Sequence, residues 1–125
     1  MKKTIHTDKA PKAVGPYSQA IEVNGTLYIS GQIPINPATG AVVEGGIVEQ
    51  TEQVFRNIKA ILSEAGYTPE HVVKTTVLMQ DLNDFAAMNE VYAQHFTAQQ
   101  PARSTFQVAK LPLGVQIEIE TVAVR

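Results

Sequence analysis

The chain has 125 residues, 44% hydrophobic and 18% charged, a composition typical of a single globular domain spanning residues 1–125. It contains no cysteine, which excludes disulfides, thiolate metal sites and cysteine nucleophiles. The net charge of −2 provides no basic excess for nucleic acid, and no apolar run approaches the roughly 20 residues of a membrane span. Because the N-terminus also lacks the apolar stretch of a secretory signal, we expect a cytoplasmic protein.

The first forty residues predict a β-hairpin between two loops. Residues 10–17 contain two prolines and a glycine and read as an ordered loop. Strands over 20–23 and 26–30 flank Asn24-Gly25, the pair best suited to a type I′ turn because both central residues need positive φ. Residues 31–40 contain two further prolines and are expected to form a long loop.

The middle of the chain predicts two helices separated by a strand. Apolar or small side chains recur every three or four residues over 47–65, and Gly66 suits the position after a helix end. The β-branched segment 72–79 predicts a strand. A second helix follows, capped by Asp81 or Asn83. Its apolar stripe consists of Phe85, Met88, Val91, Tyr92 and Phe96.

Two strands, over 102–109 and 115–124, complete the chain and are joined by a turn at 112–114. The element order is therefore ββαβαββ, with a short extra strand expected near 2–6. Two helices cannot cover both faces of a five- or six-stranded sheet. The order thus predicts an α+β fold with both helices on one face.

The last strand has one apolar face and one mixed face. Its odd positions, from Val115 to Ala123, suit a core. Its even positions are polar at one end, with Glu118 and Glu120, and apolar at the other, with Val122 and Val124. We expect another subunit to cover part of this face, with its polar end lining a wet site. The alternative is that two valines are simply exposed.

Arg103 opens an apolar strand, and its planar guanidinium suits two-point binding of a carboxylate. That carboxylate belongs either to a ligand or to a structural partner. If the last two strands formed a hairpin, Arg103 would lie opposite Glu120 and Thr105 opposite Glu118, which allows a plain cross-strand salt bridge. In the functional alternative, one glutamate orients Arg103 and the other holds water.

The sequence contains no recognisable motif for a metal site, a serine nucleophile or a nucleotide cofactor. The three histidines lack metal-ligand spacing, the serines lack a nucleophile-elbow context, and the glycines form neither a P-loop nor a dinucleotide fingerprint. We therefore expect neither a metal nor an organic cofactor. The hydroxyl of Tyr17, in the first loop, is placed either to reach a polar pocket or to pack that loop.

Six segments together resemble the RidA (YjgF) family, whose members are also named endoribonuclease L-PSP. They cover essentially the whole chain in order: Gly15–Ala20, Ser30–Pro34, Val73–Val77, Asp81–Phe85, Pro101–Ser104 and Ile117–Val124. The resemblance implies a chorismate-mutase-like fold and a homotrimer in which the sheets form a central barrel. Ligand clefts would lie between the subunits.

The resemblance also implies an activity, the hydrolysis of reactive 2-imino acids to 2-oxo acids and ammonia. It implies that Arg103 binds the substrate carboxylate and that Glu118 orients the attacking water. Tyr17, Ser30, the backbone of Gly31 and Asn89 would line the cleft. The other partners it implies are further copies of the same chain.

Two features depart from the family pattern. Many relatives have cysteine where this chain has Thr105, which keeps a hydrogen-bonding atom in the cleft wall but excludes thiol chemistry. Leu113 and Gly114 stand where relatives often have a lysine and an acid, so the rim is less charged. Two other functions stay open at this point: an endoribonuclease, and a non-catalytic trimer that binds small carboxylic acids through Arg103.

Overall fold

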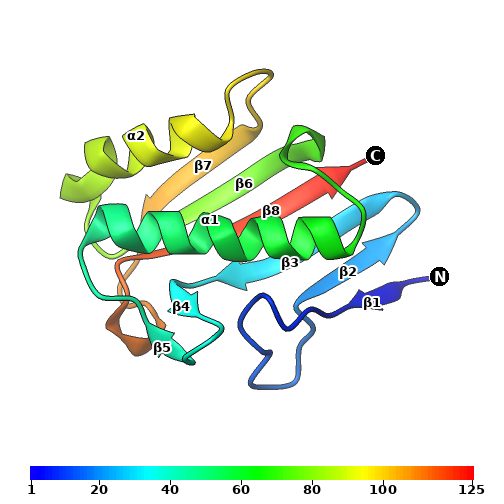
Figure 1. Cartoon of the computed structure of the whole chain (residues 1–125). Helices are drawn as coiled ribbons and strands as arrows, with labels where there is room; N and C mark the ends of the chain where they lie inside the picture. Colours follow the sequence, from blue (N-terminus) through cyan, green and yellow to red (C-terminus); the bar gives the residue numbers. More distant parts are fainter.

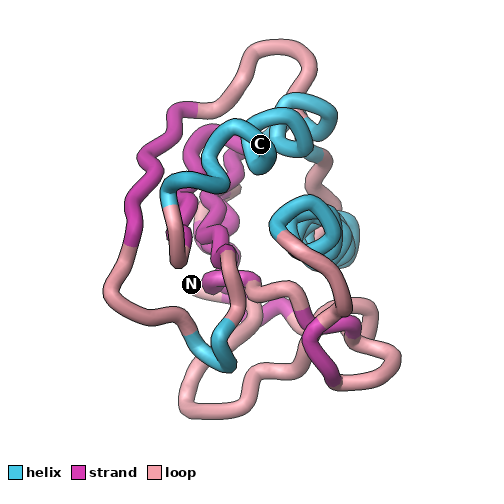
Figure 2. Tube along the Cα trace, turned by 90° about the vertical axis from the view of Figure 1, so that its left-hand side faces the viewer, coloured by secondary structure: helices cyan, strands magenta, loops and turns pink.

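A computed structural model describes all 125 residues (Figure 1). Helices α1 and α2 lie against one face of a six-stranded sheet, so the expected α+β fold is confirmed. In Figure 2 the longer helix is seen end-on beside the strands. The elements are β1 Lys3–Ile5, β2 Ala20–Val23, β3 Thr26–Gln32, β4 Ile35–Asn36, β5 Ala41–Val42, α1 Ile47–Glu64, β6 Val72–Met79, α2 Phe85–His95, β7 Ala102–Gln107 and β8 Ile117–Val124.

The predicted hairpin is present. Strands β2 and β3 pair antiparallel, and Asn24 and Gly25 between them have φ of 51° and 77°. The expected strand near the N-terminus is β1, which pairs with β2 at the edge of the sheet. The expectation of a plain loop over 31–40 is wrong, because β4 and β5 form a small two-stranded sheet of their own there.

Capping contacts precede both helices, and a glycine follows the end of α1. Before α1, the Glu49 carboxylate accepts the Gly46 N–H at 2.8 Å, and after it Gly66 has a φ of 81°. Before α2, Asp81 accepts the Asn83 N–H at 2.8 Å and so caps a short 3₁₀ turn that leads into the helix. Of the two expected caps, Asp81 therefore has this role.

The strand order is β1-β2-β3-β8-β6-β7, and all neighbours are antiparallel except β6 and β7. A parallel pair needs a crossover connection, which α2 provides. Strand β6 consequently lies between β7 and β8. The hairpin of the last two strands, and the Arg103–Glu120 salt bridge that it allowed, are wrong for this reason.

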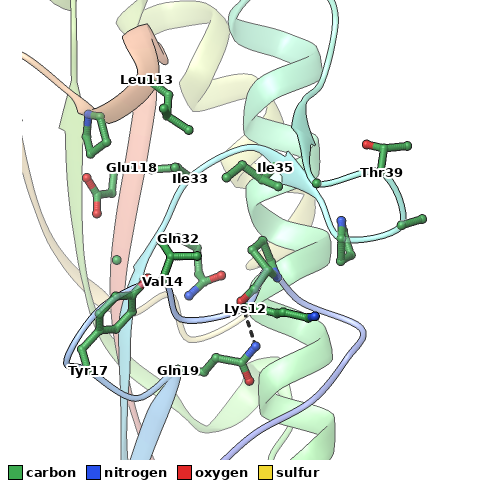
Figure 3. Close-up of a pocket in the computed structure, with 16 residues that line it drawn as sticks. Lys12, Val14, Tyr17, Gln19, Gln32, Ile33, Ile35, Thr39, Leu113 and Glu118 are labelled. Carbon is green, nitrogen blue, oxygen red and sulfur yellow. Dashed lines mark hydrogen bonds between the residues drawn. The ribbon is translucent and has the colours of Figure 1, made fainter.

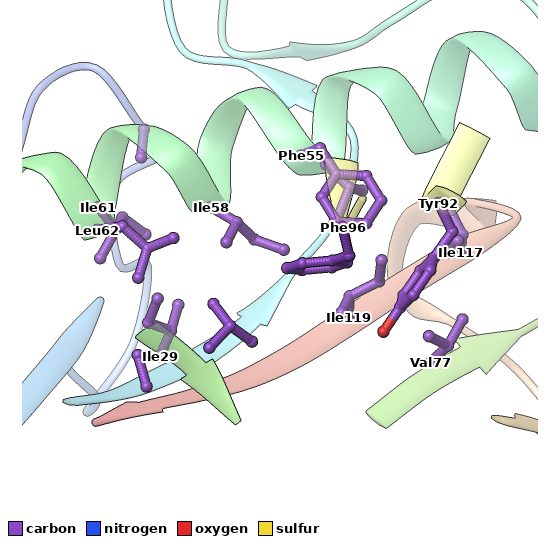
Figure 4. Close-up of a cluster of buried hydrophobic side chains, with 14 of the residues drawn as sticks. Ile29, Phe55, Ile58, Ile61, Leu62, Val77, Tyr92, Phe96, Ile117 and Ile119 are labelled. Carbon is purple, nitrogen blue, oxygen red and sulfur yellow. The ribbon is translucent and has the colours of Figure 1, made fainter. Parts of the chain in front are cut away.

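The core fills the space between the helices and the sheet (Figure 4). Residues of α1 such as Phe55 and Ile58 pack against Ile117 and Ile119 of β8, and all four are at most 1% exposed. The odd positions of β8 are buried as predicted. No helix of the structure is both long and apolar enough to cross a bilayer.

Candidate functional site

Arg103 lies near the start of β7 on the face that α2 covers. Its Nη1 donates to the Asn89 Oδ1 at 2.7 Å, and its guanidinium stacks over the rings of Tyr92 and Phe85 at 4.7 and 5.4 Å. The guanidinium forms no ion pair within the chain. These neutral contacts fix its orientation and leave its positive charge available to an anion.

Three hydroxyl groups accompany Arg103 on this face. The Tyr92 and Thr75 hydroxyls lie 2.7 Å apart, and burial raises the pKa of Tyr92, so its hydroxyl stays neutral. Thr105 lies two residues along β7, and its Oγ1 is buried without a hydrogen-bond partner. An unpaired buried hydroxyl is unusual in a folded chain, and this one has almost no accessible surface in the single chain.

Glu118 lies on the opposite, helix-free face of the sheet. Its side chain is partly buried, and this burial, with a smaller repulsion from Glu120, raises its pKa. Gly31 faces it from β3, where a Cβ atom would overlap the Glu118 carboxylate. The glycine therefore makes room for this carboxylate beside the backbone of β3.

A cavity of about 690 Å³ opens beside Glu118 (Figure 3). Tyr17 and Gly31 line it, as does the segment that contains β4. The Ser30 hydroxyl instead donates to the Ser18 carbonyl at 2.6 Å, which ties the first loop to β3. Tyr17, Gly31 and Glu118 thus line one cavity. Ser30 does not line it, but its hydrogen bond holds the loop that contains Ser18 against β3.

The structure separates the predicted site residues into two groups. Along β6, Arg103 neighbours Thr75, and Glu118 neighbours Leu78. Arg103 and Glu118 are therefore separated by three residues along the strand direction, about 10 Å, and by two inter-strand spacings, about 10 Å more. Their side chains also point to opposite faces of the sheet. One chain therefore holds Arg103, Asn89 and Thr105 together, and Tyr17, Gly31 and Glu118 together, but it does not join the groups.

The helix-free face combines Glu118 with exposed apolar side chains. Tyr28 is 51% exposed and pairs with Val122, while Phe106 is 54% and Val124 43% exposed. A patch of this kind on a regular sheet surface is typical of a protein interface. The mixed face predicted for β8 is thus continuous across β3 and β7.

Sequence reasoning missed several buried amides that shape the site. Gln19 accepts the Thr7 N–H at 2.7 Å and donates to the carbonyls of Thr7 and Pro11 at 3.0 and 2.8 Å, so it fixes the loop before Tyr17. On α1, Asn57 donates to the Ile33 and Ile35 carbonyls at 3.2 and 3.0 Å. Polar residues beside the apolar stripe of α1 were the available signal for Asn57.

No three His, Asp or Glu side chains are grouped so as to hold a metal ion. Each histidine has a local partner instead. His95 Nε2 lies 2.9 Å from the Glu52 carboxylate, His6 lies 3.1 Å from Asp8, and His71 Nδ1 accepts the Thr68 N–H at 2.9 Å.

Comparison with known proteins gives the family. The model of the family described as Endoribonuclease L-PSP matches residues 7–125. The chain belongs to this family. It is the family of the RidA resemblance: a Rid family structure from Yersinia pestis has 50% sequence identity and a TM-score of 0.98, with all of both chains covered.

Two further members of the endoribonuclease L-PSP family bear on function. The human protein named 2-iminobutanoate/2-iminopropanoate deaminase is 50% identical over 125 residues, which cover 100% of this chain and 91% of that protein. The crystal structure of E. coli TdcF with bound serine has 44% sequence identity and a TM-score of 0.94, with 98% of each chain covered. The family relationship therefore supports an enzyme of the imine deaminase kind.

Proposed function

We propose that this protein hydrolyses small 2-imino acids to 2-oxo acids and ammonia, at clefts between the subunits of a homotrimer. The observation that supports this most directly is a pair of charges without partners. Arg103 has no carboxylate within the chain, and Glu118 has no cation or hydrogen-bond donor. The relatives named deaminases, at about 50% identity, add to this support.

Arg103 binds the carboxylate of the imino acid through two parallel hydrogen bonds. Asn89 and the aromatic rings hold the guanidinium plane in place for this contact. Thr105 lies on the same side, and its hydroxyl, which has no partner within the chain, makes that part of the wall polar. These groups fix the position of the substrate, and holding it in a reactive orientation lowers the barrier to attack by water.

Glu118 accepts a proton from water as the water oxygen bonds to the imine carbon. The substrate is the protonated imine, so its C=N bond becomes a C–N single bond as the electron pair moves onto the nitrogen. Glu118 then gives its proton to the amino group of this carbinolamine. The C–N bond breaks while the hydroxyl oxygen forms the C=O bond and passes its proton to Glu118, so ammonia leaves and the 2-oxo acid remains with its protonation balanced. Its raised pKa makes Glu118 a stronger base than an exposed glutamate.

The trimer joins the two groups of residues. Because Arg103 and Glu118 lie on opposite faces of one sheet, we assign Arg103, Asn89 and Thr105 of a cleft to one subunit. Tyr17, Ser30, Gly31 and Glu118 then come from its neighbour. The exposed apolar side chains of the helix-free face support burial of this face in the assembly.

A coupled assay tests the proposal. A threonine dehydratase generates 2-iminobutanoate, and addition of the protein is expected to accelerate release of 2-oxobutanoate. Unchanged release over a wide range of protein concentration would contradict the proposal. The family description also names a nuclease, so the same preparation, free of host nucleases, is incubated with RNA. RNA cleavage that Arg103→Ala and Glu118→Gln abolish would favour the nuclease instead.

A further inference from the structure

The cavity beside Glu118 extends well beyond the carboxylate. In the single chain its volume is about 690 Å³, part of which the neighbouring subunit of the proposed trimer would occupy. Apolar side chains form much of its wall: Val14, Ile33, Ile35 and Leu113. Glu118 lines the same cavity as Ile33, Ile35 and Leu113 (Figure 3). The carboxylate therefore shares its cavity with an apolar surface.

Leu113 has two unusual properties. Its side chain is 73% exposed, and its backbone lies in the left-handed region, with φ of 56° and ψ of 19°. Leucine is rare in that region, where glycine and asparagine are common. A conformation of this kind persists only when the surrounding structure imposes it, and such residues concentrate at ligand sites.

The segment around Leu113 is held firmly on both sides. Before it, the buried Leu111 donates its N–H to the Gln80 Oε1 at 3.2 Å. After it, the Gln116 N–H donates to the buried Gln50 Oε1 at 2.8 Å. The exposed leucine is thus presented to the cavity by a fixed turn.

The opposite part of the wall is also preformed. Asn57 is 0% exposed, and its amide nitrogen donates to the Ile33 and Ile35 carbonyls. These two bonds fix the segment that presents both isoleucine side chains. The apolar surface therefore exists before any ligand binds, which lowers the entropic cost of binding.

We propose that this apolar surface binds the side chain of the substrate, and that Leu113 makes the enzyme selective for 2-imino acids with apolar side chains of three or more carbons. The inference rests on the proposed function and deepens it. Each fully buried methylene group contributes about fourfold to binding. The imine of leucine has three more carbons than that of alanine, so a preference of at least about tenfold is expected even with incomplete burial.

The test uses imines generated in solution by an amino-acid oxidase from leucine and from alanine. Semicarbazide traps the free imine, and hydrolysis by the protein is measured as the loss of semicarbazone. The wild-type protein is expected to have a kcat/KM at least about tenfold higher for the leucine-derived imine. The variant Leu113→Asn keeps a residue that tolerates the left-handed backbone and removes the apolar contact. It should reduce the preference to about threefold or less and change the rate with the alanine-derived imine less than about twofold.

Val48→Asn is the matched control, because Val48 is a 44% exposed residue on α1 that does not line the cavity. It should leave both rates unchanged. No preference in the wild-type protein, or an equal loss on both imines in Leu113→Asn, would overturn the inference and leave the deaminase function standing. Failure of the wild-type protein to hydrolyse either imine would overturn the proposed function as well.

Discussion

The orientation of Arg103 depends on neutral contacts, and this determines what its replacement should do. Arg103→Ala removes the proposed carboxylate contact and should lower kcat/KM by on the order of 100-fold or more. Arg103→Lys keeps the charge but loses the planar fork, so it should also lose much of the activity. Both variants should stay assembled and melt within a few degrees of wild type, as measured by scanning calorimetry. An unfolded or dissociated Arg103→Ala would indicate a structural role instead.

Glu118 makes stability depend on pH. Its pKa in the folded protein lies above the ordinary value of 4.5, because burial and Glu120 disfavour the charged form. The folded state therefore binds the proton more tightly than the unfolded state, and stability falls as pH rises from 4.5 through the folded pKa. Glu118→Gln removes the charge that destabilises the folded state at high pH, so it should have a higher melting temperature than wild type at pH 7. It should also lose activity, because the amide cannot accept the proton from water.

The difference in melting temperature should vanish well below pH 4.5, where the carboxyl is protonated in both states. Glu120→Gln is the control, since Glu120 is exposed and contributes only the smaller repulsion. It should raise the melting temperature at pH 7 by less than Glu118→Gln. A wild-type protein that is more stable than Glu118→Gln at pH 7 would mean that Glu118 has a stabilising partner.

Thr105 supplies a hydrogen-bonding atom and no nucleophile. Thr105→Cys should therefore keep kcat within about threefold of wild type, because a thiol has a similar size and still forms weak hydrogen bonds. Steady-state rates with 2-iminobutanoate measure this. A gain of tenfold or more with cysteine would show that the native residue limits this chemistry and that the protein serves another role.

At the scale of elements, Asn57 ties α1 to the segment that contains β4. In Asn57→Ala the Ile33 and Ile35 carbonyls lose their donor, which should cost about 2 kcal/mol of unfolding free energy. Urea titrations at one protein concentration measure the loss. Gln94→Ala, on the exposed side of α2, is the control and should stay within about 0.5 kcal/mol of wild type. Equal effects would mean that water replaces the Asn57 amide.

The local elements were predictable from the sequence, whereas their neighbours in the sheet were not. Asn24-Gly25 and Gly66 fix a turn and a helix end by their own backbone preferences, and both are as expected. The position of β8 between β3 and β6 depends on contacts distant in sequence, such as Leu27 with Ala123. Adjacent strands most often pair, so the hairpin of β7 and β8 was the natural but wrong choice.

The site was predictable only in part for a related reason. Motif positions supplied Arg103 and Glu118, and the alternation along β8 supplied the face of Glu118. The residues that position them, such as Gln19 and Asn57, act through single backbone contacts between distant segments. No periodic pattern marks such contacts, because each depends on the folded path of two loops.

For the whole molecule, we predict a homotrimer with a mass of three 13.6 kDa chains. Multi-angle light scattering at micromolar concentration tests it, and a stable monomer would contradict the clefts between subunits. The helix-free face predicts the contact, so Val122→Glu should dissociate the assembly and abolish activity. Val73→Glu, at another exposed apolar position, serves as a comparison for the effect of charge alone.

Mixing two inactive variants tests whether subunits share a cleft. Arg103→Ala and Glu118→Gln are refolded together in equal amounts, so that mixed trimers form. A cleft that takes Arg103 from one subunit and Glu118 from its neighbour is intact in about a quarter of cases, so about a quarter of wild-type activity should return. Clefts contained in single chains would give no recovery at all.

One of the two central strands of the sheet, β8, is synthesised after all its other strands. Until β8 leaves the ribosome, β3 and β6 have no partner between them, and each presents an unpaired edge. Residues 1–116 are therefore synthesised before the core can close, and the closing contacts join residues as far apart in sequence as Thr26 and Val124. Loss of β8 would thus divide the sheet in two, whereas loss of β1 would only shorten its edge. A ribosome that stalls before β8 would release a chain prone to aggregation, not a shortened enzyme.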